Sequence, residues 1–219
     1  MALPTSGTIS ISAINVEFAR SSTAATAMSQ LYRNAGIVTS NNTNVPTSGV
    51  ISLSQFYGAT NIVYPGKAIF GYGYTSASVS ITNLVSNTGV VSTDVTGVGT
   101  ARWGIAAAGY GGDKAIFGYG STGTAGNVVV PTVSITNLVS NTGAVSANVT
   151  GVGTFRQLYG AAGYDKGNKA IFGYGYAISG GSIVNLSITN LISDTGVVSA
   201  DVTGVGTARY YLAAAGFGA

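Results

Sequence analysis

One seven-residue sequence, Lys-Ala-Ile-Phe-Gly-Tyr-Gly, occurs three times and constrains the fold of this chain more than any other feature. The copies occupy residues 67–73, 114–120 and 169–175. Each copy is followed by a second constant block that begins Ser-Ile-Thr-Asn-Leu and runs on to Gly-Val-Gly-Thr. Recurrence at about 50 residues indicates several copies of one supersecondary unit, which must stack to bury a core.

The spacing between constant residues separates a framework from loops. From the Lys of the heptapeptide to the Asn of the second block the separation is 16, 23 and 21 positions in the three copies. A sheet loses its register on insertion, whereas a surface loop accepts extra residues at little cost. The other half of each copy has a fixed length, because 19 positions separate Asn from Arg in every case: Asn83 and Arg102, Asn137 and Arg156, Asn190 and Arg209.

Each unit is predicted to hold about four strands. The heptapeptide is a short apolar run that ends in glycine, and residues 79–85 alternate polar with apolar side chains. Residues 90–95 and 102–110 supply the third and fourth strands of the first unit. The predicted fold is therefore mainly β: three four-stranded repeats of about 50 residues, starting near 67, 114 and 169, in a propeller-like or three-sided array.

The repeats resemble kelch-type repeats, in which an Arg precedes one strand and a second strand ends in Gly-Gly. Here a Tyr splits that glycine pair, and Ser86 and Val91 stand where kelch repeats carry Tyr and Trp. The resemblance implies a β-propeller, although three units are fewer than the usual four to eight blades. Three arrangements stay open: a three-sided structure from one chain, a six-bladed ring from two chains, or stacking in a trimer. Because two of these arrangements need more than one chain, we expect a homo-oligomer, either a dimer or a trimer.

Composition argues against an enzyme. The chain has no His and no Cys, which removes Ser-His and Cys-His nucleophile pairs and the commonest zinc ligands. Asp94 and Asp201 occupy the same repeat position, where the middle copy carries Asn148, so these acids are interchangeable turn residues and a poor catalytic pair. The turn at 165–168 offers too few oxygens for calcium. No catalytic residue, cofactor or metal is expected.

Charge and hydropathy exclude two classes of partner. The net charge is +3 and the nine cations are scattered, which is not the footprint of a nucleic-acid-binding protein. No apolar run is long enough for a membrane span, and the start lacks a secretory leader. The protein is therefore expected to be made and assembled in a cytoplasm.

Residues 1–60 are predicted to form a separate module, followed by the repeat domain at 61–219. An apolar-Ser-x-apolar pattern recurs at 11–14, 28–31 and 53–56, which predicts helices near 12–18, 23–33 and 53–57 with the Ser as N-cap. A segment this short is marginal for independent folding, and we therefore expect it to pack on something else. It either caps the repeat array or docks on a larger assembly. The candidate docking residues are Ile14, Phe18, Leu31, Tyr32, Phe56 and Tyr57.

Three spaced blocks in this module resemble an N-terminal module of tail-fibre-like and other minor virion structural proteins of tailed phages. Ala35 stands where that family has the first Gly of a pair. The resemblance covers about a quarter of the chain and implies a virion component that binds other virion proteins through residues 1–60. The matching residues are Pro4, Ser6, Gly7, Ile9, Ser10, Ser12, Ile14, Glu17 and Phe18, then Ser29, Tyr32, Arg33, Gly36 and Val38, then Pro46, Ser48, Gly49, Ile51, Ser52, Ser54, Phe56, Tyr57 and Gly58.

The loops of variable length are the candidate binding sites, because specificity is usually carried by loops on a rigid framework. The segment just after the repeat arginine varies between copies and carries aromatic residues, which either pack or stack on sugar rings: Trp103, Gln157-Leu158-Tyr159 and Tyr210-Tyr211. The leading hypothesis is a tail-fibre-like virion protein for host attachment, whose target is a host-surface glycan or a virion neighbour; the alternative is a soluble, lectin-like sugar-binding protein. The candidate loop residues are Tyr74, Thr75, Ser76, Ser121, Thr122, Thr124, Asn127, Tyr176, Ser179, Ser182 and Asn185.

Overall fold

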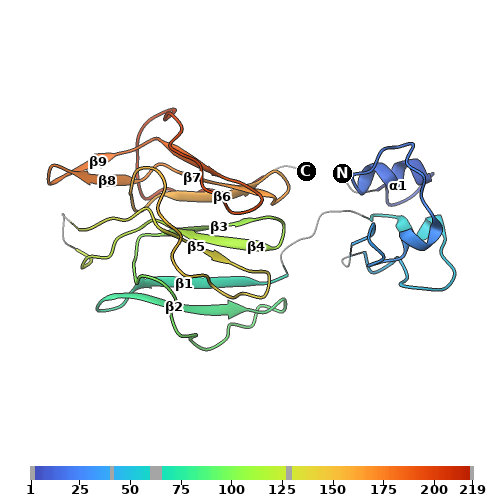
Figure 1. Ribbon diagram of the computed structural model, residues 1–219, viewed down its shortest axis with the longest axis horizontal. Coiled ribbons are helices and arrows are strands. Elements are labelled where there is room, and N and C mark those ends of the chain that lie inside the picture. Colours follow the sequence, from blue (N-terminus) through green and yellow to red (C-terminus); the bar gives the residue numbers. More distant parts are fainter. Residues whose placement is uncertain (1–2, 40–41, 60–65, 127–129, 218–219) are drawn as a thin grey trace. The chain divides into compact units, whose positions relative to one another are not determined.

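The computed structural model describes residues 3–39, 42–59, 66–126 and 130–217. The chain divides into two compact units, Met1–Val63 and Tyr64–Gly218. Short helices and turns make up the first unit, and small antiparallel sheets make up the second (Figure 1). The prediction of a mainly β fold with short helices near the N-terminus is confirmed.

The first unit contains the α-helix α1 (Ile11–Glu17) and two 3₁₀ helices, η1 (Met28–Leu31) and η2 (Leu53–Phe56). The N-cap of α1 is Ser10, whose Oγ accepts a 3.1 Å hydrogen bond from the backbone N of Ala13. The predicted cap, Ser12, lies inside the helix. Helix η2 likewise starts after Ser52, whose backbone N donates to Gln55 Oε1 at 2.7 Å.

The predicted helix at 23–33 is wrong, since only Met28–Leu31 is helical and in 3₁₀ form. Side chains bind the carbonyls that an α-helix would need. Asn15 Nδ2 donates to Ala24 O at 3.0 Å, and Arg20 Nη2 donates to Ala25 O at 2.8 Å. Side-chain hydrogen bonds of this kind compete directly with helix formation.

The first unit has a hydrophobic core drawn from its own residues. The expectation that this unit packs on something else stays a prediction. Nine buried apolar residues form this core: Leu3, Ile9, Ile14, Phe18, Leu31, Val38, Val45, Phe56 and Ala59.

The described residues of the second unit form four antiparallel sheets, three of which are built on the heptapeptides. Strands β1 (Ala68–Tyr74) and β2 (Ser78–Val85) form the first. The second has the order β3 (Ala106–Tyr110), β4 (Lys114–Gly118), β5 (Thr136–Val139), and the third the order β6 (Gly160–Tyr164), β7 (Lys169–Gly173), β10 (Thr189–Ile192). A hairpin of β8 (Tyr176–Ser179) and β9 (Ser182–Asn185) is the fourth.

The sheets hold two or three strands, so the prediction of four strands per unit needs correction. Residues 90–95 pair with β2 only through isolated bridges at Val91 and Val95. The backbone N of Leu84 instead donates to the side chain of Ser92, at 3.0 Å. A serine hydroxyl thus replaces the strand's backbone acceptor, and Ser146 and Ser199 do the same in the later copies.

The three heptapeptide sheets lie in successive layers of the second unit (Figure 1). Glycines let aromatic rings bridge the layers: Phe117 packs over Gly71, and Phe172 packs over Gly118. The ring centroid of Phe172 lies 5.5 Å from that of Tyr119 and 5.4 Å from that of Tyr159. The core therefore sits between layers, where the Phe of one heptapeptide packs over the Gly of the preceding one.

Candidate binding edge

The three loops of variable length leave the second unit at the same edge. The β1–β2 turn, the loop after β4 and the β8–β9 hairpin all lie on one side of the layered sheets (Figure 1). Ser78 Oγ donates to Gly123 O at 3.3 Å, which joins the first two of these loops. The framework thus gathers into one place the loops that the sequence marks as free to vary.

A tyrosine in the left-handed region precedes each loop. Tyr72, Tyr119 and Tyr174 have φ of 63°, 51° and 67°, and the glycine after each also has positive φ. An aromatic residue rarely adopts this conformation. Each ring is retained beneath an arginine, and each Tyr hydroxyl donates to a backbone carbonyl at 2.9–3.0 Å. The Gly-Tyr-Gly sequence thus lies at the end of the strand in the second and third copies and causes a register shift within β1 in the first, while its Tyr ring packs under an arginine.

Two of the predicted loop residues are buried anchors. Ser121 is fully buried and its Oγ donates to Pro131 O at 2.9 Å. Tyr176 is 7% exposed, and Gln157 Nε2 donates to its hydroxyl at 2.7 Å. These side chains hold the loops in place, which corrects their interpretation as residues that face a ligand.

The other predicted loop residues lie nearer the surface. Tyr74 and Thr122 are half-buried, and the Tyr74 ring lies 6.1 Å from that of Trp103. Asn127 lies outside the described residues. Six candidates are exposed and together define what we term the loop edge: Thr75, Ser76, Thr124, Ser179, Ser182 and Asn185.

The aromatic residues that follow the repeat arginines divide between core and surface. Tyr159 is 5% exposed, and burial raises its pKa well above the ordinary value. Trp103 is half-buried, with its indole N donating to Gly123 O at 2.8 Å. Tyr210 and Tyr211 are 37% and 76% exposed. Of these four residues, only Tyr210 and Tyr211 have rings exposed to solvent.

A groove that the sequence did not reveal lies between the second loop and the β8–β9 hairpin. Its volume is 440 Å³. No ionisable side chain is among the residues that line it, so it is suited to apolar contact and not to acid–base chemistry. The lining residues are Val130, Pro131, Thr132, Phe155 and Ile178.

Arg102 is completely buried between two layers, in what we term the first joint: Thr100, Arg102, Asn137 and Asn148. Its guanidinium lies 4.2 Å from the ring centroid of Tyr72, in its own layer. Its Nη2 donates to Asn137 Oδ1, in the next layer, at 2.6 Å. Beside it, Asn148 accepts from the backbone N of Thr100 at 3.1 Å and donates to Thr100 Oγ1 at 2.7 Å. Hydrogen bonds to neutral groups therefore connect the layers.

The second joint consists of Thr154, Arg156, Asn190 and Asp201 and repeats this geometry. Arg156 is buried 4.5 Å from the ring centroid of Tyr119, and its Nη2 donates to Asn190 Oδ1 at 2.7 Å. Thr154 Oγ1 donates to Asp201 Oδ2 at 2.6 Å. Burial raises the pKa of Asp201, but hydrogen bonds from Thr154 and Asn190 outweigh burial and leave that pKa below its ordinary value.

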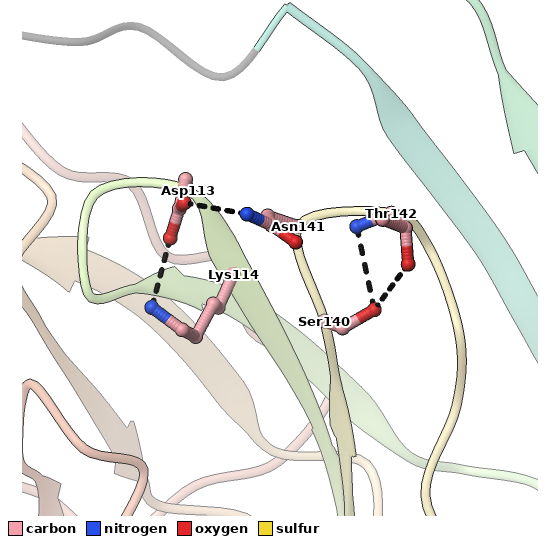
Figure 2. Close-up of polar contacts among 5 residues, drawn as sticks. All are labelled: Asp113, Lys114, Ser140, Asn141 and Thr142. Atoms are coloured by element: carbon pink, nitrogen blue, oxygen red, sulfur yellow. Dashed lines mark hydrogen bonds and ion pairs between the residues drawn. The ribbon is translucent and has the colours of Figure 1, made fainter.

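The remaining acids of the second unit include turn residues engaged with lysine. Asp113 forms a 2.9 Å ion pair with Lys114 and accepts a 3.3 Å hydrogen bond from Asn141 (Figure 2). The hydrogen bond from Lys114 lowers the pKa of Asp113, against the opposing effect of burial. In the neighbouring turn, Ser140 and Thr142 share a 2.8 Å hydrogen bond. Asp113 thus ties two turns together, and no cluster of three or more His, Cys, Asp or Glu that could hold a metal occurs among the described residues.

Four of the predicted docking residues belong to the core of the first unit. Ile14, Leu31 and Phe56 are completely buried, and Phe18 is 8% exposed. The hydroxyls of the other two, Tyr32 and Tyr57, donate to Gly49 O and Gly7 O of the same unit. Among the described residues of this unit, the large apolar side chains that are exposed are Val16, Met28, Val50 and Leu53, none of which was a candidate docking residue.

Within the described segments, no helix is long and apolar enough to cross a membrane. A scan against known protein families finds no match to this chain, and a search of curated proteins finds no significant match either.

Proposed function

We propose that the chain is a tail-fibre-like structural protein of a phage virion, which docks through its first unit and binds its target through the loop edge without chemical turnover. The three ordered blocks within residues 4–58 support the virion assignment. The observation that carries the binding role is that three loops of unequal length leave one edge of one framework. Such an arrangement varies a binding surface without disturbing the core.

The chemistry of the loop edge suits a neutral polar target. Its exposed side chains are hydroxyls and one amide, and Tyr211 adds an open ring beyond them. Hydroxyl and amide groups with aromatic rings suit sugars, so we infer a host-surface glycan, or a virion neighbour, as the target. Weak contacts of this kind gain strength when several copies act together. We propose that the repeats present this edge as a propeller-like or three-sided array.

Exposed valines favour an assembly component over a free sugar-binding protein. Soluble monomers rarely expose large apolar areas, and this surface carries few charges. The valines follow β2, β5 and β10 in each copy and are at least 37% exposed: Val90, Val91, Val95, Val98, Val149, Val152, Val197, Val202 and Val205.

Docking is tested on virions assembled with a variant of the first unit in which Val16, Met28 and Val50 are replaced by Ser. These side chains are 59%, 47% and 90% exposed, so the fold is expected to persist. Incorporation into virions should fall at least tenfold. The control changes two exposed polar residues of the same unit, Thr43→Ala and Thr47→Ala, and should leave incorporation unchanged. If the Val16, Met28 and Val50 variant and a deletion of residues 1–60 were both incorporated normally, docking by this unit would be refuted.

Target binding is tested by replacing all six loop-edge residues with Ala. Adsorption of virions to host cells, and binding of the purified protein to a glycan array, should both fall. The control replaces Thr96, Thr150 and Thr203, three exposed threonines at one repeat position away from the variable loops. Unaltered adsorption would leave a purely architectural role, whereas tight glycan binding by a monomer that never joins virions would favour the lectin alternative.

A further inference from the structure

The C-terminal end of the second unit carries the donor half of a joint. Thr207 and Arg209 occupy the repeat positions of Thr100 and Arg102. The guanidinium of Arg209 lies 4.3 Å from the ring centroid of Tyr174, as that of Arg102 lies over Tyr72. Arg209 is nevertheless exposed, whereas Arg102 is fully buried. Among the described residues its guanidinium donates to Thr207 O, at 3.1 Å, and reaches no side-chain amide.

The opposite end carries the matching acceptor half. Asn83 Nδ2 donates to Ser92 O at 3.1 Å and to Asp94 Oδ1 at 2.8 Å. Asn137, at the same repeat position, makes the equivalent bonds and also accepts from Arg102 through its Oδ1. No donor from the described part of the chain reaches Asn83 Oδ1. The amide is therefore held in the orientation that an arginine would require.

The same two ends carry unpaired strand edges. In the middle layer β3 pairs with β4, with Tyr110 opposite Lys114 and Ala106 opposite Gly118. Strand β1 shares Ala-Ile-Phe-Gly with β4 but, within the described ranges, pairs only with β2. Residues 213–217, Ala-Ala-Ala-Gly-Phe, match Ala-Ala-Ala-Gly-Tyr of β3, yet they are all exposed and belong to no described strand.

The bridging rings show the same interruption. Phe117 and Phe172 are 3% and 0% exposed, because each packs over a glycine of the preceding layer, whereas Phe70 is 62% exposed. At the other end, a Cβ placed on Gly173 would meet Thr189 alone within 4 Å among the described residues, and no aromatic ring. Within the part of the chain that the structure describes, the Phe70 ring therefore packs over no glycine, and Gly173 receives no aromatic ring.

We propose that the second unit assembles head to tail with a second copy of this chain, in a third joint of the same construction as the first two. Residues 213–217 of one copy pair antiparallel with residues 67–71 of the next, with Phe217 opposite Lys67. Arg209 donates to Asn83 of the second copy and Thr207 to Asp94 of the second copy, while Phe70 of the second copy packs over Gly173. Every group in this contact has a counterpart in an inner joint.

A second copy is the occupant that the structure favours. The halves lie on the two outermost layers of the stack, so one chain does not bring them together (Figure 1). The contact joins two different surfaces, so it is heterologous and closes into a ring or continues as a filament. It rests on the contacts alone and stands whether or not the chain is a virion component.

Disulfide trapping tests the register directly, because the chain has no cysteine of its own. Lys67→Cys and Phe217→Cys change exposed residues, so both full-length variants should fold. An oxidised equimolar mixture of the two should give a covalent dimer of one copy of each. The register control pairs Ala68→Cys with Phe217→Cys, a shift of one residue that turns the side chains to opposite faces, and its yield should be at least fivefold lower.

The double variant, with both cysteines in one chain, separates the alternatives. Intermolecular ladders or closed rings of several chains support head-to-tail assembly. An intramolecular disulfide within a monomer would overturn it in favour of single-chain closure, and the absence of any register-specific disulfide would overturn it outright.

The arginine contact is tested by sedimentation of Arg209→Gln. Losing the charged donor should weaken self-association at least tenfold. The matched control is Lys166→Gln, which also removes one exposed positive charge but lies in the β6–β7 turn. Equal association of the wild type, Arg209→Gln and Lys166→Gln would contradict the proposed contact.

Discussion

The two inner joints of the second unit use the same side chains at the same spacing, yet they differ in two places. Arg102 Nε donates to Tyr119 O at 2.8 Å, whereas Arg156 Nε is buried without a partner among the described residues. The first joint contains Asn148 where the second has Asp201. The shared Thr, Arg and Asn define the joint, and the fourth residue can be neutral or charged. The differences therefore predict which joint contributes more to stability, and how each responds to pH.

The largest expected effect comes from removing a joint arginine. Arg102→Met should lower the free energy of unfolding by about 4 kcal/mol and Arg156→Met by about 3 kcal/mol. Each substitution leaves the buried side-chain amide of an asparagine without its hydrogen-bond donor, and Arg102 makes one more hydrogen bond than Arg156. Denaturation followed by the fluorescence of Trp103, the single tryptophan, measures both. Arg209→Met, at an exposed arginine, is the control and should change little in dilute protein. Equal losses for Arg102→Met and Arg156→Met would mean that the Nε hydrogen bond contributes nothing.

The second-largest loss of stability is expected for substitutions of the glycines over which aromatic rings pack. A Cβ at Gly118 would overlap the Phe172 ring, whereas a Cβ at Gly173 would meet only Thr189 at 3.1 Å. Gly118→Ala should therefore cost about 2–3 kcal/mol, and Gly173→Ala less than about 1 kcal/mol in dilute protein. The same fluorescence measurement ranks them, and a larger loss for Gly173→Ala would contradict the layered packing.

Tyr119 should make the protein sensitive to alkali. Burial raises the pKa of Tyr119 to about 12, against the opposing effect of Arg156. The neutral phenol is thus favoured in the folded state, so its contribution is complete below the unfolded pKa of about 10 and is lost as the pH rises toward 12. Tyr119→Phe should remove that part of the alkaline slope. The substitution should also cost about 1 kcal/mol at neutral pH, because the hydroxyl donates to Val152 O at 2.9 Å.

The smallest expected effect distinguishes the fourth residues. The pKa of Asp201 is depressed in the folded state, so its contribution is present above the unfolded pKa of about 3.9 and is lost as the pH falls through the folded value. Asp201→Asn should flatten this part of the acid slope and change stability by less than about 1 kcal/mol at pH 7, because the side chain is exposed. Asn148→Asp should add a similar slope to the first joint. Identical acid transitions in Asp201→Asn and the wild type would show that the carboxylate plays no such part.

The sequence predicted the features that depend on local pattern. Strands at the heptapeptides and the position of the variable loops follow from alternation, glycine and the freedom of loop length. The failures involve side chains that take over backbone roles: Asn15 and Arg20 prevent a helix at 23–33, and Ser92 interrupts the third predicted strand. Residue type alone does not show which backbone group a polar side chain will bind.

The joints could be predicted only in part. Arg102 binds Asn137, which lies 35 residues farther along the chain, so no local periodicity connects them. Yet the constant separation of 19 positions between Asn and Arg marks both residues as framework. The candidate docking residues show the opposite problem, because a large apolar side chain such as Phe56 suits a core and a docking surface equally well.

The tyrosine in each Gly-Tyr-Gly sequence limits how this chain can diverge. At Tyr119 the backbone conformation favours glycine, while the packed ring and its hydroxyl require tyrosine. Glycine would relieve the backbone and lose the ring, and a β-branched residue would satisfy neither demand. Such a position permits few single-step replacements. Repeats of this kind can therefore diversify in their loops, while the tyrosine that precedes each loop remains nearly fixed.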